Sequence, residues 1–214
     1  MTTPTPGRTS VPGLTVRKAT AADTERIAEL LSGDPGQEAV AVAGCYEAAR
    51  KFGMALVRLP DSPQGWQHSV VAELEGEVAG IMQGGVDEID YGLTPSLAWL
   101  AFRVFGVGFV SVLGRYRVLQ RVGIPHPRDS YYIGEINVAA ELRNRGIGGA
   151  LLDHATAEAK RLGCAQMSLN TTITNPAQHL YERHGFRIVE TRTDPEYERM
   201  TGIPGRVLMI KELT

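Results

Sequence analysis

The sequence predicts a single α/β domain in which short strands and amphipathic helices alternate. Its 214 residues suit one domain, or one domain with an insertion. Apolar residues make up 43% of the chain and charged residues 21%, which is ordinary for a globular protein with a buried core. Strand-like alternation, a hairpin turn and a glycine-rich turn that leads into a helix follow one another along the chain.

The composition argues against several classes of protein. Cys45 and Cys164 lie far apart without a CxxC spacing, which argues against a disulfide scaffold or a zinc knuckle and fits a reducing cytoplasm. The five histidines form no HExxH pattern, so we expect no metal. A formal net charge of −2 gives no general attraction to nucleic acid or membranes. The Thr/Pro-rich start lacks the apolar stretch of a secretory signal, so we expect a flexible tail over 1–13 and one domain over 14–214.

The first ordered elements are predicted from local patterns. We expect a strand at 14–17, a helix at 21–31 that starts at a capping-box-like Thr20 and Asp23, and a helix at about 38–52. The last two strands are expected at 186–191 and 206–212, joined by a polar loop.

A hairpin is predicted at 68–74 and 78–86, joined by a Glu-Gly-Glu turn. Four acids gather near its ends. The preferred interpretation is a solvated strand end, and the alternative is a site that holds a cationic acceptor. These acids are Glu77, Asp87, Glu88 and Asp90.

The segment 97–128 is the most unusual. Residues 97–113 are apolar apart from Arg103 and Ser111, yet they fall short of the roughly 20 residues that cross a bilayer, so we expect no stable membrane insertion. The whole segment contains five arginines and no acid. The favoured interpretation is a helical insert that packs on the core or across a dimer interface. The alternative is a pair of helices that line an apolar acceptor pocket or touch a membrane surface.

A glycine-rich turn carries the clearest chemical signal. A strand-like run at 131–138 precedes the sequence RNRGIGGA at 143–150, which leads into a helix with an apolar stripe that ends before Gly163. Free amides at a helix start bind phosphate, and glycines let the phosphate approach, so a diphosphate ligand is predicted. The turn fits neither GxGxxG, which needs glycine at Leu151, nor a P-loop, which needs Lys-Ser/Thr. The alternative is that these small residues only pack the helix on the sheet.

Two motifs give the chain a family resemblance. Arg143-x-x-Gly146-x-Gly148 resembles the coenzyme A motif of the GNAT superfamily of acyl-CoA-dependent N-acyltransferases. Asn175-Pro176-Ala177, followed by the LYERHGF run at 180–186, resembles the second signature of that family. The resemblance implies an α/β (α+β) fold with a mixed, mostly antiparallel central sheet flanked by helices, and a helical insert at 97–128 between strands 3 and 4.

The resemblance also implies a binding site for acetyl-CoA and a general acid. The matching asparagine commonly meets the pantetheine arm, the matching strand backbone pairs with it, and the loop amides receive the pyrophosphate. Tyr181 matches the tyrosine that donates a proton to the leaving thiolate, and the alternative for it is core packing. The cofactor-binding residues are then expected to be Val138, Arg143, Asn144, Arg145, Gly146, Ile147, Gly148, Gly149, Ala150 and Asn175.

The general base is the role for which the sequence offers several candidates. An amine must lose a proton before it attacks a thioester, and a carboxylate is the usual acceptor. Glu135 is the best candidate, with Tyr132 and the acidic hairpin end as rivals and an ion-pair role as the alternative. Asn170, at another position where the family carries its glutamate, cannot act as a base.

These observations predict an N-acetyltransferase that moves an acetyl group from acetyl-CoA directly to a primary amine, on a small molecule or a peptide. We expect no covalent intermediate and no nucleic-acid partner, and a homodimer is compatible with the apolar insert. Two alternatives stay open: a non-catalytic acyl-CoA-binding or regulatory module, and a membrane-surface acyltransferase for an apolar amine.

Overall fold

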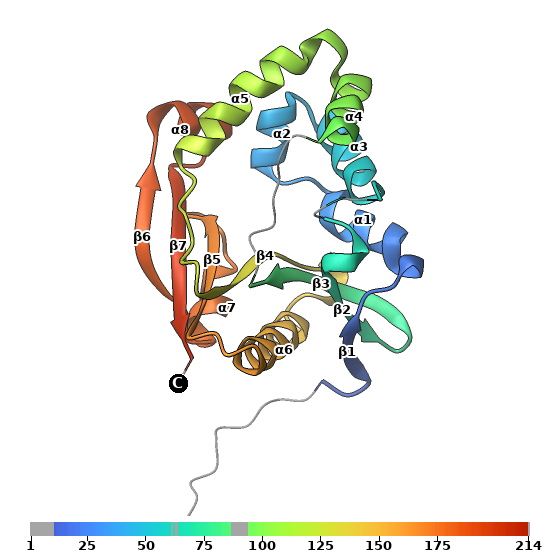
Figure 1. The fold of residues 1–214 in the computed structure, drawn as a ribbon, viewed down its shortest axis with the longest axis vertical. Coiled ribbons are helices and arrows are strands. Elements are labelled where there is room, and N and C mark those ends of the chain that lie inside the picture. The colour runs from blue at the N-terminus through green and yellow to red at the C-terminus, as the bar shows by residue number, and fades with distance from the viewer. Residues whose placement is uncertain (1–10, 61, 63, 87–93, 214) are drawn as a thin grey trace, which may run out of the picture.

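The computed structural model describes residues 11–60, 62, 64–86 and 94–213. Its strands form one sheet in the order β1-β2-β3-β4-β5-β7-β6 (Figure 1). Only the β4–β5 pair is parallel. This confirms the predicted mixed, mostly antiparallel sheet. The strands are β1 (Leu14–Lys18), β2 (Ser69–Leu74), β3 (Glu77–Gly85), β4 (Ser130–Val138), β5 (Gln166–Thr172), β6 (Arg187–Thr193) and β7 (Gly205–Glu212).

Helices cover both faces of the sheet. Helices α6 and α7 pack on one face, while α1 and α3 pack on the other and α2, α4 and α5 extend that layer. The insert between β3 and β4 contains α4 and α5, as predicted. The α-helices are α1 (Thr24–Ser32), α2 (Gln37–Ala43), α3 (Tyr46–Val57), α4 (Pro95–Phe105), α5 (Phe109–Arg121), α6 (Ile147–Arg161), α7 (Gln178–Arg183) and α8 (Pro195–Thr201).

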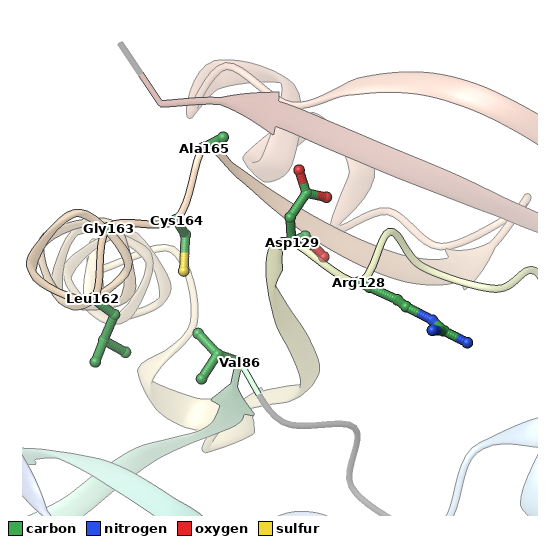
Figure 2. A pocket seen from close by; sticks show the side chains of 8 residues that line it. Val86, Arg128, Asp129, Leu162, Gly163, Cys164 and Ala165 are labelled. Carbon is green, nitrogen blue, oxygen red and sulfur yellow. The ribbon is translucent and has the colours of Figure 1, made fainter.

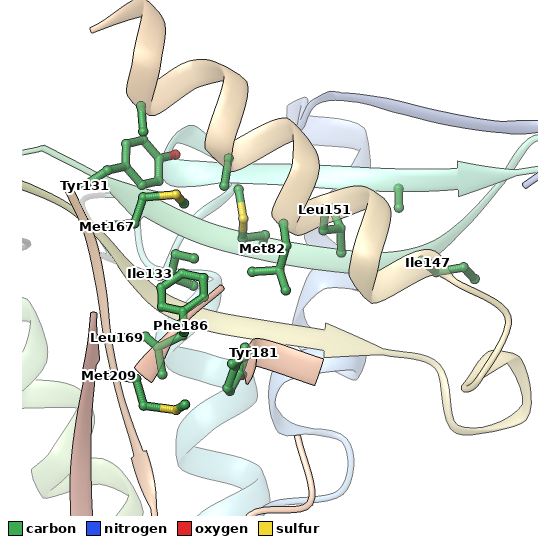
Figure 3. Close-up of a cluster of buried hydrophobic side chains, with 14 of the residues drawn as sticks. Met82, Tyr131, Ile133, Ile147, Leu151, Met167, Leu169, Tyr181, Phe186 and Met209 are labelled. Carbon is green, nitrogen blue, oxygen red and sulfur yellow. The ribbon is translucent and has the colours of Figure 1, made fainter. Parts of the chain in front are cut away.

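The main hydrophobic core lies between α6 and the sheet. Figure 3 shows α6 crossing the strands, with Ile147 and Leu151 above Met82, Ile133 and other sheet residues. The buried positions on α6 repeat every three to four residues, so one face of the helix meets the sheet. The apolar stripe predicted from the sequence is confirmed up to Ala159. The spacing of the sequence also places Leu162 on this stripe, but Leu162 is exposed, and α6 ends before it at Arg161.

Local signals explain the first elements. The β2–β3 loop has two residues, Glu75 and Gly76, and both have positive φ, as a type I′ hairpin turn requires. The Asp23 carboxylate accepts a hydrogen bond from the Thr20 backbone N–H at 2.7 Å, which confirms the predicted helix start. Arg17 on β1 donates two further hydrogen bonds to Asp23, at 2.8 and 3.0 Å, and so ties the helix start to the sheet.

The Arg17–Asp23 pair predicts an acid-sensitive contribution to stability. Hydrogen bonds from Arg17 lower the pKa of Asp23 to about 2, below its unfolded value, so this stabilisation is complete above about pH 4 and is lost as the pH falls toward 2. We expect Asp23→Asn to lose about 1–2 kcal/mol at pH 7, since Asp23 is buried. Urea unfolding at several pH values measures this. A difference between variant and wild type that stays constant from pH 7 to pH 3 would contradict the ion-pair origin.

Two sequence predictions on helices were wrong. The helix expected at 38–52 is two helices, because Gly44 adopts a left-handed φ of 94° and ends α2. The polar loop expected before β7 contains α8. Asp194 caps α8 through hydrogen bonds from the amides of Glu196 and Tyr197, and Gly202 ends it.

The insert is a bent pair of helices. Pro95–Arg121 is 27 residues long and contains an 18-residue window with a mean hydropathy of 1.8, so by length and composition it could cross a membrane. It is interrupted at Gly106–Gly108, and its arms of 11 and 13 residues would span only about 16 and 20 Å, against about 30 Å of hydrocarbon. Figure 1 shows the arms as an arch, with α3 against α4 and α2 against α5. The expectation of no stable insertion stays a prediction.

Candidate functional site

The sheet opens between its two halves. The parallel ladder between β4 and β5 covers only Ser130–Ile133 and Gln166–Leu169, although β4 continues to Val138. Beyond Ile133 and Leu169, β4 and β5 no longer pair with each other. A cavity of about 1270 Å³ starts at this gap and extends beneath the α1–α5 layer. The cavity reaches both sequence motifs, because its lining includes Arg143, Asn175 and Tyr181.

A β-bulge directs Glu135 into this cavity. In the β3–β4 ladder Gln83 pairs with Glu135 but Gly84 pairs with Ile133, so Gly134 is the extra residue. As a result Ile133 and Ile136, three residues apart, both pack in the core under α6. Glu135 therefore lies on the opposite face, where it lines the cavity.

Glu135 has the environment of a base. Its side chain is exposed to solvent within the cavity, but protein surrounds the cavity, and the resulting desolvation raises the pKa of Glu135 above the ordinary glutamate value. Arg206 opposes the rise and Glu38 adds to it. Among the residues that the structure describes, none forms a hydrogen bond or ion pair with the Glu135 carboxylate. The alternative ion-pair role therefore has no support here, and the carboxylate is free to accept a proton.

The rival bases are less suited. The Tyr132 ring stacks on His126 with centroids 4.2 Å apart, and burial raises the pKa of Tyr132, which disfavours the phenolate. Asn170 donates to the Ile124 carbonyl at 2.8 Å and holds the loop after α5. Glu77 sits at the β2–β3 turn and does not line the cavity. Asp87, Glu88 and Asp90 lie outside the described residues.

Tyr181 belongs to both the core and the cavity. Its ring packs edge-on to Phe186 with centroids 6.1 Å apart (Figure 3). It is buried, and it also lines the cavity. Burial raises its pKa well above the ordinary tyrosine value, and the charge of Glu135 adds to the rise. The phenol therefore keeps its proton at neutral pH, as a general acid must. Core packing and a site role are thus compatible.

Gly146 and Gly148 in the glycine-rich turn are each favoured by the local geometry, for different reasons. Gly146 precedes α6 with a φ of 85°, a conformation that L-residues rarely adopt. A Cβ at Gly148 would lie 3.1 Å from Leu180 Cδ2, so this glycine lets α6 approach α7 closely. The packing interpretation of the turn is therefore correct in part, and it leaves the helix-start amides available.

One expectation about the turn needs correction. The Ala150 N–H donates to the Gly146 carbonyl at 3.0 Å, as the first hydrogen bond of α6. It is not available to a ligand, unlike the amides of Ile147, Gly148 and Gly149, which precede the first full helical turn. The predicted phosphate cradle is thus one residue shorter than expected.

Arg143 and Asn175 already form hydrogen bonds with other residues of the protein. The Arg143 Nε donates to the Val138 carbonyl at 3.3 Å, so the side chain lies along the end of β4. Asn175 accepts from the Ala177 amide at 2.9 Å and donates to Thr171 Oγ1 at 2.7 Å. Asn175 therefore shapes the β5–α7 turn rather than capping α7 directly, since α7 begins at Gln178.

A second, smaller pocket lies elsewhere. It measures about 270 Å³ and is formed at the start of β4, where Figure 2 shows the Cys164 sulfur directed toward Val86. Cys45 precedes α3 and is exposed. Neither cysteine lines the large cavity. Within the described ranges, no group of three His, Cys, Asp or Glu residues is arranged to hold a metal ion.

Sequence reasoning missed part of the cavity wall. Glu38 on α2 accepts a hydrogen bond from the Tyr197 hydroxyl at 2.6 Å and lies 3.5 Å from Arg206 Nε. Glu38 and Arg206 both line the cavity. They are far apart in the sequence and belong to no motif, so only the folded chain brings them together.

Comparison with known proteins agrees with this geometry. Residues 43–186 match the family model of the acetyltransferase (GNAT) family. The chain therefore belongs to the GNAT family, whose activity is acyl transfer from acyl-coenzyme A. No curated protein matches the sequence.

Solved structures share the fold along most of the chain. A crystal structure of an acetyltransferase is 25% identical, with a TM-score of 0.56 over 94% of this chain and 100% of that one. An N-acetyltransferase from Staphylococcus aureus Mu50 is 19% identical, with a TM-score of 0.58 over 92% and 99%. PaiA N-acetyltransferase from Thermoplasma acidophilum, solved with coenzyme A, is 14% identical, with a TM-score of 0.53 over 93% and 98%.

Proposed function

We propose that this protein is an N-acetyltransferase that transfers the acetyl group of acetyl-CoA to a primary amine. One observation carries the proposal. A carboxylate with a raised pKa, Glu135, and a protonated phenol, Tyr181, line the same cavity where the β4–β5 ladder ends. A base and an acid beside one gap in a sheet suit the attack of an amine on a thioester.

The residues around the gap fit acetyl-CoA. The edge of β4 between Gly134 and Val138 offers backbone groups that can pair with the amides of a pantetheine arm. The first amides of α6 and the exposed Arg143 and Arg145 offer hydrogen bonds and positive charge to the diphosphate. The co-substrate supplies the activated thioester.

The chain's own groups would then move two protons. Glu135, directly or through water, takes a proton from the ammonium so that the amine nitrogen can attack the thioester carbonyl carbon. As the new C–N bond forms and the C–S bond breaks, Tyr181 donates its proton to the departing sulfur. The nitrogen, which carries a positive charge after the attack, then releases its second proton, and this proton restores the Tyr181 phenol directly or through water. The cavity holds the amine near the thioester, which supplies much of the acceleration.

Calorimetry followed by a thiol-release assay tests this proposal. We expect acetyl-CoA to bind, whereas NADH and ATP serve as controls that should bind much more weakly. Thiol release that depends on an added amine would establish the transfer. Binding without turnover, for every amine offered, would instead identify a non-catalytic acyl-CoA-binding module. Absence of binding to any acyl-CoA would show that the glycine turn only packs α6.

The two glycines that flank α6 allow an effect on stability to be distinguished from an effect on acetyl-CoA binding. Gly146 and Gly163 lie just outside the two ends of this helix, and both have left-handed φ, of 85° and 76°. We expect Gly146→Ala and Gly163→Ala each to lose about 1 kcal/mol of stability because L-residues are strained there. Only Gly146→Ala should also weaken acetyl-CoA binding, since it shifts the first-turn amides. Equal calorimetric affinities for the two variants would argue against the proposed phosphate cradle.

A further inference from the structure

The wall of the cavity beneath the insert is apolar. The α3–α5 helices contribute aromatic and aliphatic side chains, and the rings of Phe52 and Phe105 meet there with centroids 5.1 Å apart. Such a lining favours a ligand that has apolar surface to bury. The lining side chains from these helices include Phe52, Leu56, Leu97, Ala101, Phe105, Phe109, Val112 and Leu113.

The charged residues that line the cavity are mostly acidic. Glu29, Asp34, Glu38, Glu135 and Glu141 line it, against Arg26, Arg143 and Arg206. Two of these arginines already pair with carboxylates of the wall. Arg26 Nη1 lies 3.0 Å from Glu29 Oε2, and Arg206 Nε lies 3.5 Å from Glu38 Oε1. The remaining negative charge favours a cationic ligand and disfavours one that carries a carboxylate.

We infer that the acceptor is a monoamine with an apolar alkyl or aryl body. This inference rests on the proposed function and names its substrate class. The ammonium would lie near Glu135, and the body would lie against the wall formed by α3–α5. A polyamine fits less well, because its second ammonium would be desolvated against the wall formed by α3–α5, to which these helices contribute no carboxylate.

Matched amines test this inference. Hexylamine and hexane-1,6-diamine have the same length and differ by one ammonium. With saturating acetyl-CoA, we expect kcat/KM to favour hexylamine at least tenfold, and to rise roughly fourfold with each methylene from butylamine to hexylamine. A diamine or ethanolamine that is used as well as hexylamine would overturn the inference but leave the transferase proposal intact. No turnover with any amine would overturn the transferase proposal itself.

Two neighbouring residues on α5 provide matched variants. Val112 lines the cavity, whereas Ser111 is exposed and does not line it. We expect Val112→Asp to move the preference toward the diamine, because the new carboxylate can pair with the second ammonium, while Ser111→Asp keeps the wild-type preference. If Val112→Asp does not fold, Val112→Thr should still lower kcat/KM for hexylamine several-fold. Equal effects at both positions would contradict the assigned wall.

A different observation, on the outer side of the same helices, carries a second inference. Trp99 and Phe102 on α4 are 62% and 56% exposed, and Val107 and Val110 at the bend are 97% and 76% exposed. The rings of Trp99 and Phe102 stack with centroids 6.0 Å apart. We call these four residues the insert patch. Large exposed apolar groups gathered in this way mark an interaction surface.

The charge around the insert patch indicates its partner. Arg103 and Arg117 are exposed on the same two helices and form no ion pair with any residue in the described part of the chain. Residues 97–128 contain no acid. A second copy placed on this patch by two-fold symmetry would bring arginines together without a counter-charge. We propose that the insert patch binds the surface of an anionic membrane, with its apolar side chains in the interface and its arginines at the headgroups.

Flotation with vesicles tests this second inference. We expect the protein to float with phosphatidylglycerol-containing vesicles, to float less in high salt, and not to float with pure phosphatidylcholine. Arg103→Gln and Arg117→Gln should each weaken binding about fivefold. Trp99→Ser should also weaken it, unlike Ile188→Ser, which changes an exposed residue on β6. Absence of flotation, salt-independent flotation, or a dimer that Trp99→Ser dissociates would overturn this inference.

Discussion

Replacing Glu135 with glutamine should lower kcat for acetyl transfer by roughly 10²–10⁴-fold, while the affinity for acetyl-CoA stays within about twofold. The substitution keeps the shape of the side chain but removes the only carboxylate that lies in the cavity wall contributed by β4. Steady-state thiol release and calorimetry measure the two quantities separately.

The pH dependence of kcat should also report the titration of Glu135. Desolvation by the cavity walls raises the pKa of Glu135, so wild-type kcat should fall on the acid side with a midpoint above the ordinary glutamate value of about 4.3. This limb should be absent in Glu135→Gln. Because the pKa of Glu135 is higher in the folded than in the unfolded protein, ionisation of Glu135 lowers the free energy of unfolding as the pH rises through the folded-state pKa. At neutral pH the glutamine variant should therefore be no less stable than the wild type.

A rival acid provides the control for Glu135. Glu77→Gln alters the hairpin acid that does not line the cavity, and we expect wild-type kcat from it. Loss of activity in Glu77→Gln, or full activity in Glu135→Gln, would place the base elsewhere.

The Tyr181→Phe variant should also lose turnover, by roughly 10²-fold or more, because the departing thiolate would leave without a proton. Binding of acetyl-CoA should change little. Phenylalanine keeps the edge-on contact with Phe186, so thermal unfolding should shift by no more than about 2 °C. Turnover, calorimetry and thermal unfolding of the same preparation separate the roles of the hydroxyl and the ring.

Tyr131 provides the matched control for Tyr181. It is a buried tyrosine of the same core and does not line the cavity (Figure 3). We expect Tyr131→Phe to keep wild-type kcat. Equal losses in both variants would mean that Tyr181 acts only by packing.

Patterns that are local in the chain were sufficient for much of the fold. The α6 stripe and the β2–β3 hairpin follow from periodicity and from Gly76, which tolerates positive φ, although the turn is one residue shorter than the predicted Glu-Gly-Glu. The signals for α8 are also local, since Asp194, Pro195 and Gly202 form an ordinary helix start and stop. The predicted loop there was an error of interpretation rather than a lack of information. By contrast, the break at Gly44 depended on one glycine whose left-handed conformation the apolar spacing does not reveal.

The sequence by itself determined the family, the glycine turn, and the identities of Glu135 and Tyr181 as candidates, because these depend on residues close together in the chain. Only the tertiary structure decided which way Glu135 points. Strict alternation would place it on the same face as Ile133, and the bulge at Gly134, set by pairing with β3, moves it to the other. The partners Glu38 and Arg206 and the apolar wall come from segments far apart in the chain. Their contacts depend on how the helices pack over the sheet, which no local pattern specifies.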